Sequence, residues 1–302
     1  MVQSRPMSDS PLRVGLVGAG PWAGMFHAPM LAAGPHTSLD AVWARRTEAA
    51  EELAGEYAAT AVGSFEELLE RSDVIAFAVP PDVQAELAPR AAAAGKHLVL
   101  EKPLAFTVEG AQAIVDAVDA AGVMTLVILR NRYTATGRAF LAAAQAAAAR
   151  GGQARYVTGA ALEGSPFATP WRVERGALFD LAPHVLDLMD GAMGLVEGLT
   201  AVGDPRHWVA LETRHAGGAV GQVSLSITTP ETAGPMRCEV FTENGPVVFD
   251  GAASDGESGI EATLMEVFAE AVASGVPPEA DVHRALHLQR LIAAAEDSLA
   301  QA

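Results

Sequence analysis

Short apolar runs alternate with amphipathic segments through the first 129 residues of the chain. Five runs rich in Val, Leu, Ile and Ala have the length and composition of buried parallel strands: 12–17, 39–44, 73–79, 97–100 and 124–129. Between them, apolar residues three and four positions apart predict helices at 22–33, 47–58, 65–71, 83–94 and 108–121. Strands that alternate with helices form a parallel sheet covered on both faces, so this half is predicted to be a Rossmann-type α/β domain.

The pattern changes after Leu129. Val223, Leu225 and Ile227 alternate with polar neighbours, which predicts a strand with one buried face. Asn244-Gly245 is a strong signal for a hairpin between two such strands. The sequence therefore predicts a second, α+β domain with a largely antiparallel open sheet. Its expected helices are an alanine-rich one at 134–149, one at 177–190 and two at the end of the chain, 259–274 and 281–299.

These patterns predict four segments of the chain. They are a flexible tail at 1–10, a dinucleotide-binding Rossmann domain at 11–124, an α+β substrate and oligomerisation domain at 125–277, and a C-terminal helix at 278–302. Ser64 with Glu67 and, separately, Thr107 have the spacing of residues that cap two helices of the first domain.

The first strand ends in a glycine turn that opens a helix. Gly18, Gly20 and Ala23 give the spacing G-x-G-x-x-A, in which the first glycine permits the tight turn and the second lets a pyrophosphate approach the backbone. The helix that follows offers N–H groups to phosphates. This position favours dinucleotide binding over a merely structural turn, and Pro21 and Trp22 within the loop are expected to line the cofactor.

The end of the second strand indicates which dinucleotide is bound. Asp40 has nearly the spacing of the acid that binds the ribose of NAD, but it lies at the start of the strand. At the strand end the expected carboxylate is replaced by Ala44, followed by Arg45 and Arg46. Because guanidinium groups fit a 2′-phosphate, we expect NADP(H) to be preferred over NAD(H), with Arg45 as the main contact. The alternative is two solvated arginines.

Two more strand ends carry candidate residues. Pro80 and Pro81 form a rigid turn after the third predicted strand, and Lys102, between Glu101 and Pro103, follows the fourth. In doubly wound sheets this edge is where ligands bind. A solvated lysine is the alternative reading, but the position favours a role at the ligand.

Composition narrows the function classes further. Half of the 302 residues are hydrophobic and no apolar run reaches the ~20 residues of a membrane span, so a globular, cytoplasmic protein is expected. The net charge of −17 argues against nucleic acid or anionic membrane as partners. Cys238 is the only cysteine and the histidines show no metal-like spacing, so no metal site is predicted.

These motifs together resemble the Gfo/Idh/MocA oxidoreductases, the group that contains glucose–fructose oxidoreductase and inositol dehydrogenase. The shared features are G-x-G-x-x-A, Pro80-Pro81-Asp82, the sequence AGKHLVLEKPLA around Lys102, LRNRY around Asn131 and Arg132, Trp171-Arg172, and GALFDLAPHVLDLM at 176–189. The resemblance covers nearly the whole chain. It implies a homodimer or homotetramer formed through the C-terminal sheet, a C-terminal helix that packs back on the Rossmann domain, and a cis Lys102–Pro103 bond.

The resemblance also implies that Lys102, Asp180 and His184 form the catalytic group. Positions four apart share a helix face, which suits Asp180 and His184 to converge on one substrate carbon. His184 is expected to exchange the proton, Lys102 to bind the reacting oxygen, and Asp180 to orient His184 or bind a neighbouring hydroxyl. Without the resemblance, a helix-terminal charge and a core histidine would explain Asp180 and His184.

Other residues take expected roles from the same resemblance. The cofactor contacts are Gly18, Gly20, Pro21, Trp22, Ala23, Ala44, Arg45, Arg46, Pro80, Pro81, Gln84, Glu101, Lys102 and Asn131. The substrate contacts are Lys102, Arg132, Trp171, Arg172, Asp180 and His184. Gln84 stands where the family pattern PPxxH has histidine, which is expected to alter a cofactor or substrate contact. His27 is expected to be structural, and Trp171 either stacks on a sugar ring or belongs to the core.

The function predicted from the sequence is hydride transfer between NADP(H) and a carbinol or carbonyl carbon of a sugar, sugar derivative or cyclitol. Two alternatives remain open at this point. One is a non-catalytic regulatory protein of the same fold that binds a dinucleotide. The other is a reductase of an imine, a dihydrodiol or a biliverdin-like substrate.

Overall fold

The computed structural model describes residues 10–230 and 236–301, which fall into two compact units. The first unit comprises the chain up to Ile128 together with Gly259–Leu286, and the second comprises Leu129–Ser258 and the chain from His287 onward. Residues 1–9 of the expected tail lie outside the described part of the chain.

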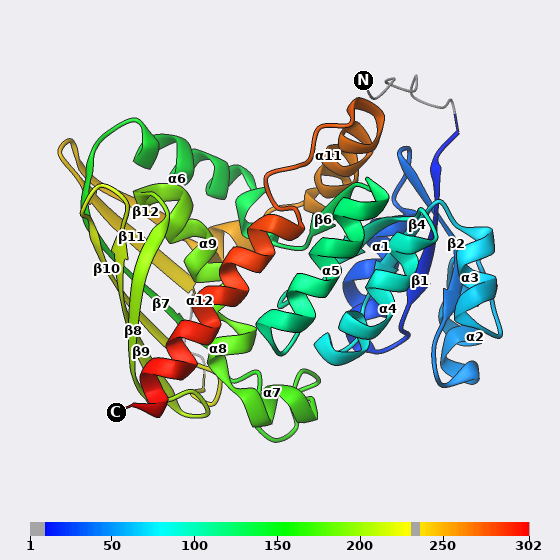
Figure 1. Cartoon of the computed structure of the whole chain (residues 1–302), viewed down its shortest axis with the longest axis horizontal. Helices are drawn as coiled ribbons and strands as arrows, with labels where there is room; N and C mark the ends of the chain where they lie inside the picture. The colour runs from blue at the N-terminus through cyan, green and yellow to red at the C-terminus, as the bar shows by residue number, and fades with distance from the viewer. Residues whose placement is uncertain (1–9, 231–235, 302) are drawn as a thin grey trace. The chain divides into compact units, whose positions relative to one another are not determined.

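The first unit contains a parallel sheet of six strands in the order β3-β2-β1-β4-β5-β6 (Figure 1). The strands are β1 (Leu12–Val17), β2 (Thr37–Trp43), β3 (Thr60–Ala61), β4 (Val74–Phe77), β5 (His97–Leu100) and β6 (Thr125–Val127). This order is that of a Rossmann domain, so the predicted fold class is confirmed, and it places the ligand crevice beside β1 and β4. Only β3 was not predicted, because two residues at the sheet edge leave no apolar run.

Helices flank this sheet and begin close to the predicted positions. They are α1 (Ala28–Ala32), α2 (Thr47–Glu56), α3 (Phe65–Arg71), α4 (Pro81–Ala93), α5 (Val108–Ala121), α11 (Ile260–Ser274) and the first part of α12 (Val282–Ala300). Both predicted caps are present: Ser64 accepts a hydrogen bond from the N–H of Glu67, and Thr107 accepts one from the N–H of Gly110. The helix predicted at 22–33 begins instead with a π-helical turn, η1 (Ala23–His27).

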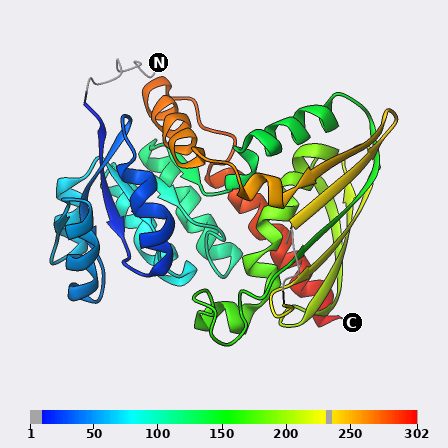
Figure 2. The same cartoon turned by 180° about the vertical axis from the view of Figure 1, so that it is seen from behind.

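The second unit contains a mixed sheet in the order β12-β11-β7-β10-β9-β8. Its strands are drawn in green to gold in Figure 2. Its strands are β7 (Ala149–Val157), β8 (Val196–Asp204), β9 (Trp208–His215), β10 (Val220–Ser226), β11 (Met236–Thr242) and β12 (Gly245–Asp250). Only β7 and β10 pair in parallel, so the prediction of a largely antiparallel sheet is confirmed, as is the hairpin at Asn244-Gly245.

The helices of the second unit cover one face of this sheet. They are η2 (Arg130–Arg132, a 3₁₀ turn), α6 (Ala135–Gln145), α7 (Pro170–Arg175), α8 (Ala177–Asp180), α9 (Ala182–Met193), α10 (Gly251–Asp255) and the later part of α12. Val223, Leu225 and Ile227 are buried on the covered face, where α9 packs against β7, β10 and β11. The helix predicted at 134–149 is shorter because Ala149 already begins β7.

The division between the units differs from the boundaries expected at 125 and 278. Ala280 accepts a hydrogen bond from Val127 at 2.7 Å, and Val282 donates one to the hydroxyl of Thr125, so this returning segment belongs to the Rossmann unit. From His287 onward α12 belongs to the second unit, where Ser298 accepts a hydrogen bond from the N–H of Ala201. An amphipathic pattern indicates that one face of a helix is buried, but it does not identify the sheet against which that face packs.

Candidate active site

The glycine loop has the geometry that a dinucleotide requires. Gly18 has φ +109°, and a Cβ there would lie 2.4 Å from the carbonyl oxygen of Ala78, so only glycine fits. A Cβ added to Gly20 would meet no atom within 4 Å, so this side of the loop is open to a phosphate group. These residues fit the cofactor that the motif implies.

Candidate residues from three neighbouring strands lie at one edge of the sheet. The strands β1, β4 and β5 run parallel and adjacent, and their carboxyl ends lead into the loops that carry Gly18, Pro80 and Lys102. The Lys102–Pro103 peptide bond is cis, as expected. The structure therefore brings the glycine loop, the proline turn and the candidate lysine to the edge where ligands of doubly wound sheets bind.

The end of β2 lies beside the glycine loop. The N–H of Gly18 donates a 2.8 Å hydrogen bond to the carbonyl oxygen of Trp43, the last residue of the strand. Ala44 comes next, followed by Arg45 and Arg46, which are exposed. Asp40 lies within the strand, 3.5 Å from Arg71, which agrees with the prediction that it is not the ribose-binding acid.

Glu101 is the centre of a polar cluster in the first unit. Its Oε1 accepts hydrogen bonds from Nε1 of Trp22 and Nε2 of His27, both at 2.7 Å, and its Oε2 accepts one from the N–H of Lys102 at 3.3 Å. Burial alone would raise the pKa of Glu101, but the interactions with His27, Lys102 and Trp22 together hold it below its ordinary value. These contacts therefore favour the carboxylate form of Glu101. The single N–H donor of the Trp22 side chain is thus used within the protein, on Glu101. The contact expected of Trp22 from the sequence is with the cofactor.

The side chain of Gln84, which is expected from the sequence to contact the cofactor, binds backbone groups of the protein. Its side chain is fully buried; Nε2 donates to the carbonyl oxygens of Glu101 and Leu104 at 2.9 and 3.0 Å, and Oε1 accepts from the N–H of Glu101 at 2.8 Å. The amide thus holds the loop that carries Lys102, and a cofactor contact of Gln84 stays a prediction. Its partners are backbone groups, which leave no signal in a sequence.

Asp180 and His184 lie on either side of a helix break. The predicted single helix divides at Leu181, so Asp180 ends α8 and His184 lies in the first turn of α9. Asp180 is buried, and its Oδ1 accepts a 3.0 Å hydrogen bond from Nε of Arg172 in α7. The ring of His184 meets that of Tyr156 edge-on, with centroids 6.2 Å apart. Tyr156 was missed because no strand was predicted at 149–157.

Trp171 and Arg172 form a single group with Asp180. The guanidinium of Arg172 lies 4.6 Å from the centre of the Trp171 ring, a cation–π contact, while its Nε binds Asp180. Trp171 is half-buried, and whether its ring stacks on a sugar or belongs to the core stays a prediction.

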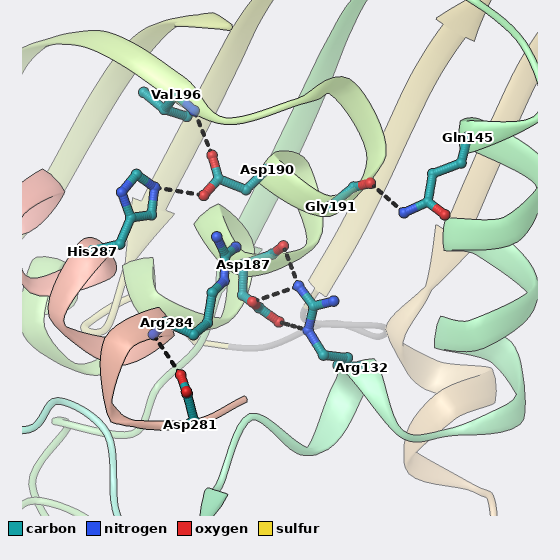
Figure 3. A network of polar contacts seen from close by, with 9 residues as sticks. All are labelled: Arg132, Gln145, Asp187, Asp190, Gly191, Val196, Asp281, Arg284 and His287. Atoms are coloured by element: carbon teal, nitrogen blue, oxygen red, sulfur yellow. Dashed lines mark hydrogen bonds and ion pairs between the residues drawn. The ribbon is translucent and has the colours of Figure 1, made fainter. Parts of the chain in front are cut away.

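The side chain of Arg132, which is expected from the sequence to contact the substrate, pairs with an acid of the same unit. Arg132 is 8% exposed and forms a two-pronged ion pair with Asp187, with Nε–Oδ2 and Nη2–Oδ1 distances of 3.0 and 2.7 Å (Figure 3). Its guanidinium joins η2 to α9, which favours a structural role, and the expected substrate contact stays a prediction. The neighbouring Asn131 directs its amide to the sulfur of Met236 at 3.2 Å.

Two negative observations apply to the described residues alone. No group of three or more His, Cys, Asp or Glu side chains that could hold a metal ion occurs among residues 10–230 and 236–301. Within the same part of the chain, every helix is too short or too polar to cross a bilayer.

Comparisons with known proteins agree with this fold and these motifs. In sequence, the chain is 31% identical over 232 residues to levoglucosan dehydrogenase of Pseudarthrobacter phenanthrenivorans, a match that covers 69% of this chain and 57% of that one. It is 40% identical over 101 residues to dTDP-3,4-didehydro-2,6-dideoxy-alpha-D-glucose 3-reductase of Actinomadura kijaniata, covering 33% of this chain and 30% of the relative. The chain thus spans less than two thirds of the length of these relatives.

Solved structures match over nearly the whole chain. GenD2 from gentamicin A biosynthesis, solved in complex with NAD, has a TM-score of 0.86 at 22% identity and covers 99% of this chain and 97% of its own. WlbA of Bordetella pertussis, solved with NADH and UDP-GlcNAcA, has a TM-score of 0.83 at 23% identity, covering 95% and 96%. At these identities the likeness establishes the fold.

The family models settle the relationship. Residues 12–129 match the model described as the oxidoreductase family with an NAD-binding Rossmann fold, and residues 141–248 match the GFO/IDH/MocA C-terminal domain. The chain belongs to the GFO/IDH/MocA oxidoreductase family.

Proposed function

We propose that the protein is a nicotinamide-dependent oxidoreductase that transfers a hydride to or from a carbinol or carbonyl carbon of a sugar, sugar derivative or cyclitol. The observation that carries the proposal is Lys102 on a clamped loop, at the same sheet edge as the open glycine loop. The names of the relatives levoglucosan dehydrogenase and dTDP-sugar 3-reductase support a sugar-like substrate.

Each of the three candidate side chains has a distinct chemical role in this proposal. The bound dinucleotide supplies the ring that accepts or donates the hydride. Lys102 donates a hydrogen bond to the reacting oxygen and stabilises the negative charge that develops there. In oxidation, His184 takes the proton of the substrate hydroxyl, and in reduction it returns a proton to the carbonyl oxygen. Asp180, fixed by Arg172, orients the substrate or the imidazole.

A substrate screen tests this function. The purified protein is mixed with oxidised nucleotide and a panel of sugars, nucleotide sugars and cyclitols, and the absorbance of the reduced nicotinamide is followed. Turnover of at least one polyhydroxylated compound supports the proposal. Nucleotide binding without turnover of any of them, or turnover of imines or dihydrodiols only, would overturn it in favour of a regulatory protein or a different reductase.

We further propose that NADP(H) is preferred over NAD(H), because the end of β2 offers Arg45 and no carboxylate. A charge-assisted hydrogen bond contributes ~1.5–3 kcal/mol, so Arg45→Ala is expected to weaken NADPH binding by about 10–100-fold and to leave NADH binding unchanged. Fluorescence titration with both nucleotides measures this, with Arg206→Ala, at an exposed arginine of the second unit, as the control. The solved neighbours hold NAD or NADH, so tighter binding of NADH by the wild type would reverse the assignment.

The outer face of the second sheet supports a homo-oligomer. Five large apolar side chains are exposed on strands β8 to β12: Val202, Trp208, Val220, Phe241 and Val248. Exposed apolar side chains gathered on one sheet favour association with a second copy of the chain. We expect light scattering to give at least twice the 31.2 kDa mass of the chain, and Phe241→Lys to shift the mass towards the monomer. A monomeric wild type at working concentration would contradict this.

A further inference from the structure

The π-helical turn after the glycine loop aims two side chains at one carboxylate oxygen. Trp22 and His27 are five residues apart, and in an α-helix, at about 100° per residue, they would point about 140° away from each other. A π-turn closes an i to i+5 hydrogen bond, here from the N–H of Ala28 to the carbonyl oxygen of Ala23, so it carries more residues per turn. Both side chains consequently reach Oε1 of Glu101 at 2.7 Å.

The backbone of Glu101 is held by a separate residue, Gln84 of α4. Gln84 binds both the N–H and the carbonyl oxygen of Glu101, and it reaches on to the carbonyl oxygen of Leu104. The N–H of Lys102, the next residue, is in turn bonded to Oε2 of Glu101. Every backbone and side-chain polar group of Glu101 is thus engaged, and the side chain of Lys102 starts from an immobilised peptide.

The clamp, formed by Trp22, His27 and Gln84 around Glu101, holds a carboxylate in a largely buried position. A largely buried carboxylate loses solvation, and an apolar side chain of similar volume would pack there without that cost. Of the two side chains that bind the carboxylate, Trp22 lies within the loop that would hold the pyrophosphate, and His27 ends the π-turn that follows it. The arrangement therefore links cofactor loop and lysine loop through one fixed residue.

We infer that Trp22, His27 and Gln84 are positioning residues that act through Glu101 to fix Lys102 for the reaction. The inference rests on the proposed function, because it assigns the lysine a reacting oxygen to bind. Misplacement of a catalytic group by about 1 Å costs on the order of 100-fold in rate. The clamp should thus affect turnover much more than nucleotide affinity.

Trp22→Phe is the sharpest test, because it removes the indole N–H and keeps a ring that can stack on Phe26, whose centroid lies 4.9 Å away. We expect kcat to fall by about 10-fold, and by about 100-fold in Glu101→Gln, with a much smaller change in the Kd for the nucleotide. Asp73→Asn is the matched control: this carboxylate is also held, by Arg13 at 2.9 Å, but at the amino end of the sheet, so kcat should not change.

A second readout needs no substrate. Lys102 and Lys96 are the two lysines of the sequence and flank β5, so labelling of side-chain amines followed by mass spectrometry compares them within one molecule. Release of the clamp should raise the labelling rate of Lys102 relative to Lys96 in Trp22→Phe and Glu101→Gln, and not in Asp73→Asn.

The outcomes separate the clamp from the proposed function. A lower kcat together with faster labelling of Lys102 supports the positioning role. Faster labelling of Lys102 with unchanged kcat would show that the clamp stabilises the loop but does not position Lys102 for the reaction. Unchanged labelling in both variants would show that the clamp does not hold Lys102, and would overturn the inference. If the wild type turns over no substrate, the proposed function fails, while the labelling comparison still decides whether the clamp holds Lys102.

Discussion

Lys102→Met is expected to lose turnover by about 100- to 1,000-fold while it binds the nicotinamide nucleotide as the wild type does. The estimate follows from the cost of removing one donor from an oxygen that develops negative charge. Methionine has a similar length and lacks the donor, and the loop stays fixed because Gln84 and Glu101 hold it through the backbone. Steady-state kinetics on the substrate found by screening, with a fluorescence titration of the nucleotide, measures both quantities.

Lys96→Met is the matched control for this prediction. Lys96 precedes β5 and donates to the carbonyl oxygen of Ser72 at 2.8 Å, whereas Lys102 follows the other end of the same strand. We expect Lys96→Met to change the melting temperature slightly and kcat not at all. Equal losses of kcat and of nucleotide affinity in Lys102→Met would show that this lysine binds the cofactor and does not act on the reacting oxygen.

The Rossmann half was predictable because each level of its sequence indicates the same structure. The apolar runs are continuous, the caps at Ser64 and Thr107 are sharp, and the glycine spacing falls on a strand end. These signals are local, so one sequence suffices to find them. The second unit was predicted more coarsely, since the exposed faces of its long strands mix polar and apolar residues, and β7 to β9 contain few uninterrupted apolar runs.

The contacts of Gln84 and Arg132 within the protein were not predictable, for a different reason. Gln84 and Arg132 occupy positions from which a ligand contact is reasonable, and their true partners are set by the tertiary fold. The partners of Gln84 are carbonyl and N–H groups, which every residue has. The partner of Arg132 is Asp187, 55 positions away, and nothing in the spacing distinguishes it from the other acids of that region. The motifs thus located the candidate site. The contacts that its side chains make within the protein could be found only from the structure.

The pair of Arg132 and Asp187 should be among the most sensitive points for stability. Asp187 is 1% exposed, and its removal leaves a buried guanidinium without its carboxylate, which costs about 3–5 kcal/mol. For a unit of this size each kcal/mol lowers the melting temperature by about 2–4 °C, so Asp187→Ala should melt about 10 °C below the wild type. Calorimetry measures this directly. Arg130→Ala is the control, because its partner Asp255 is half-exposed and such pairs contribute about 0–1 kcal/mol.

The double variant Arg132→Met/Asp187→Leu separates stability from substrate binding. Apolar residues of similar volume often replace a buried ion pair without loss, so most of the lost stability should return. If Arg132 is structural, as its burial and its two bonds to the carboxylate of Asp187 indicate, this variant should have the KM and kcat of the wild type. A KM raised by about 10-fold or more in a variant of normal stability would instead place the guanidinium at the substrate, as the motif alone implied. In this one stable variant, a structural role of Arg132 predicts an unchanged KM, and a substrate contact predicts a raised KM.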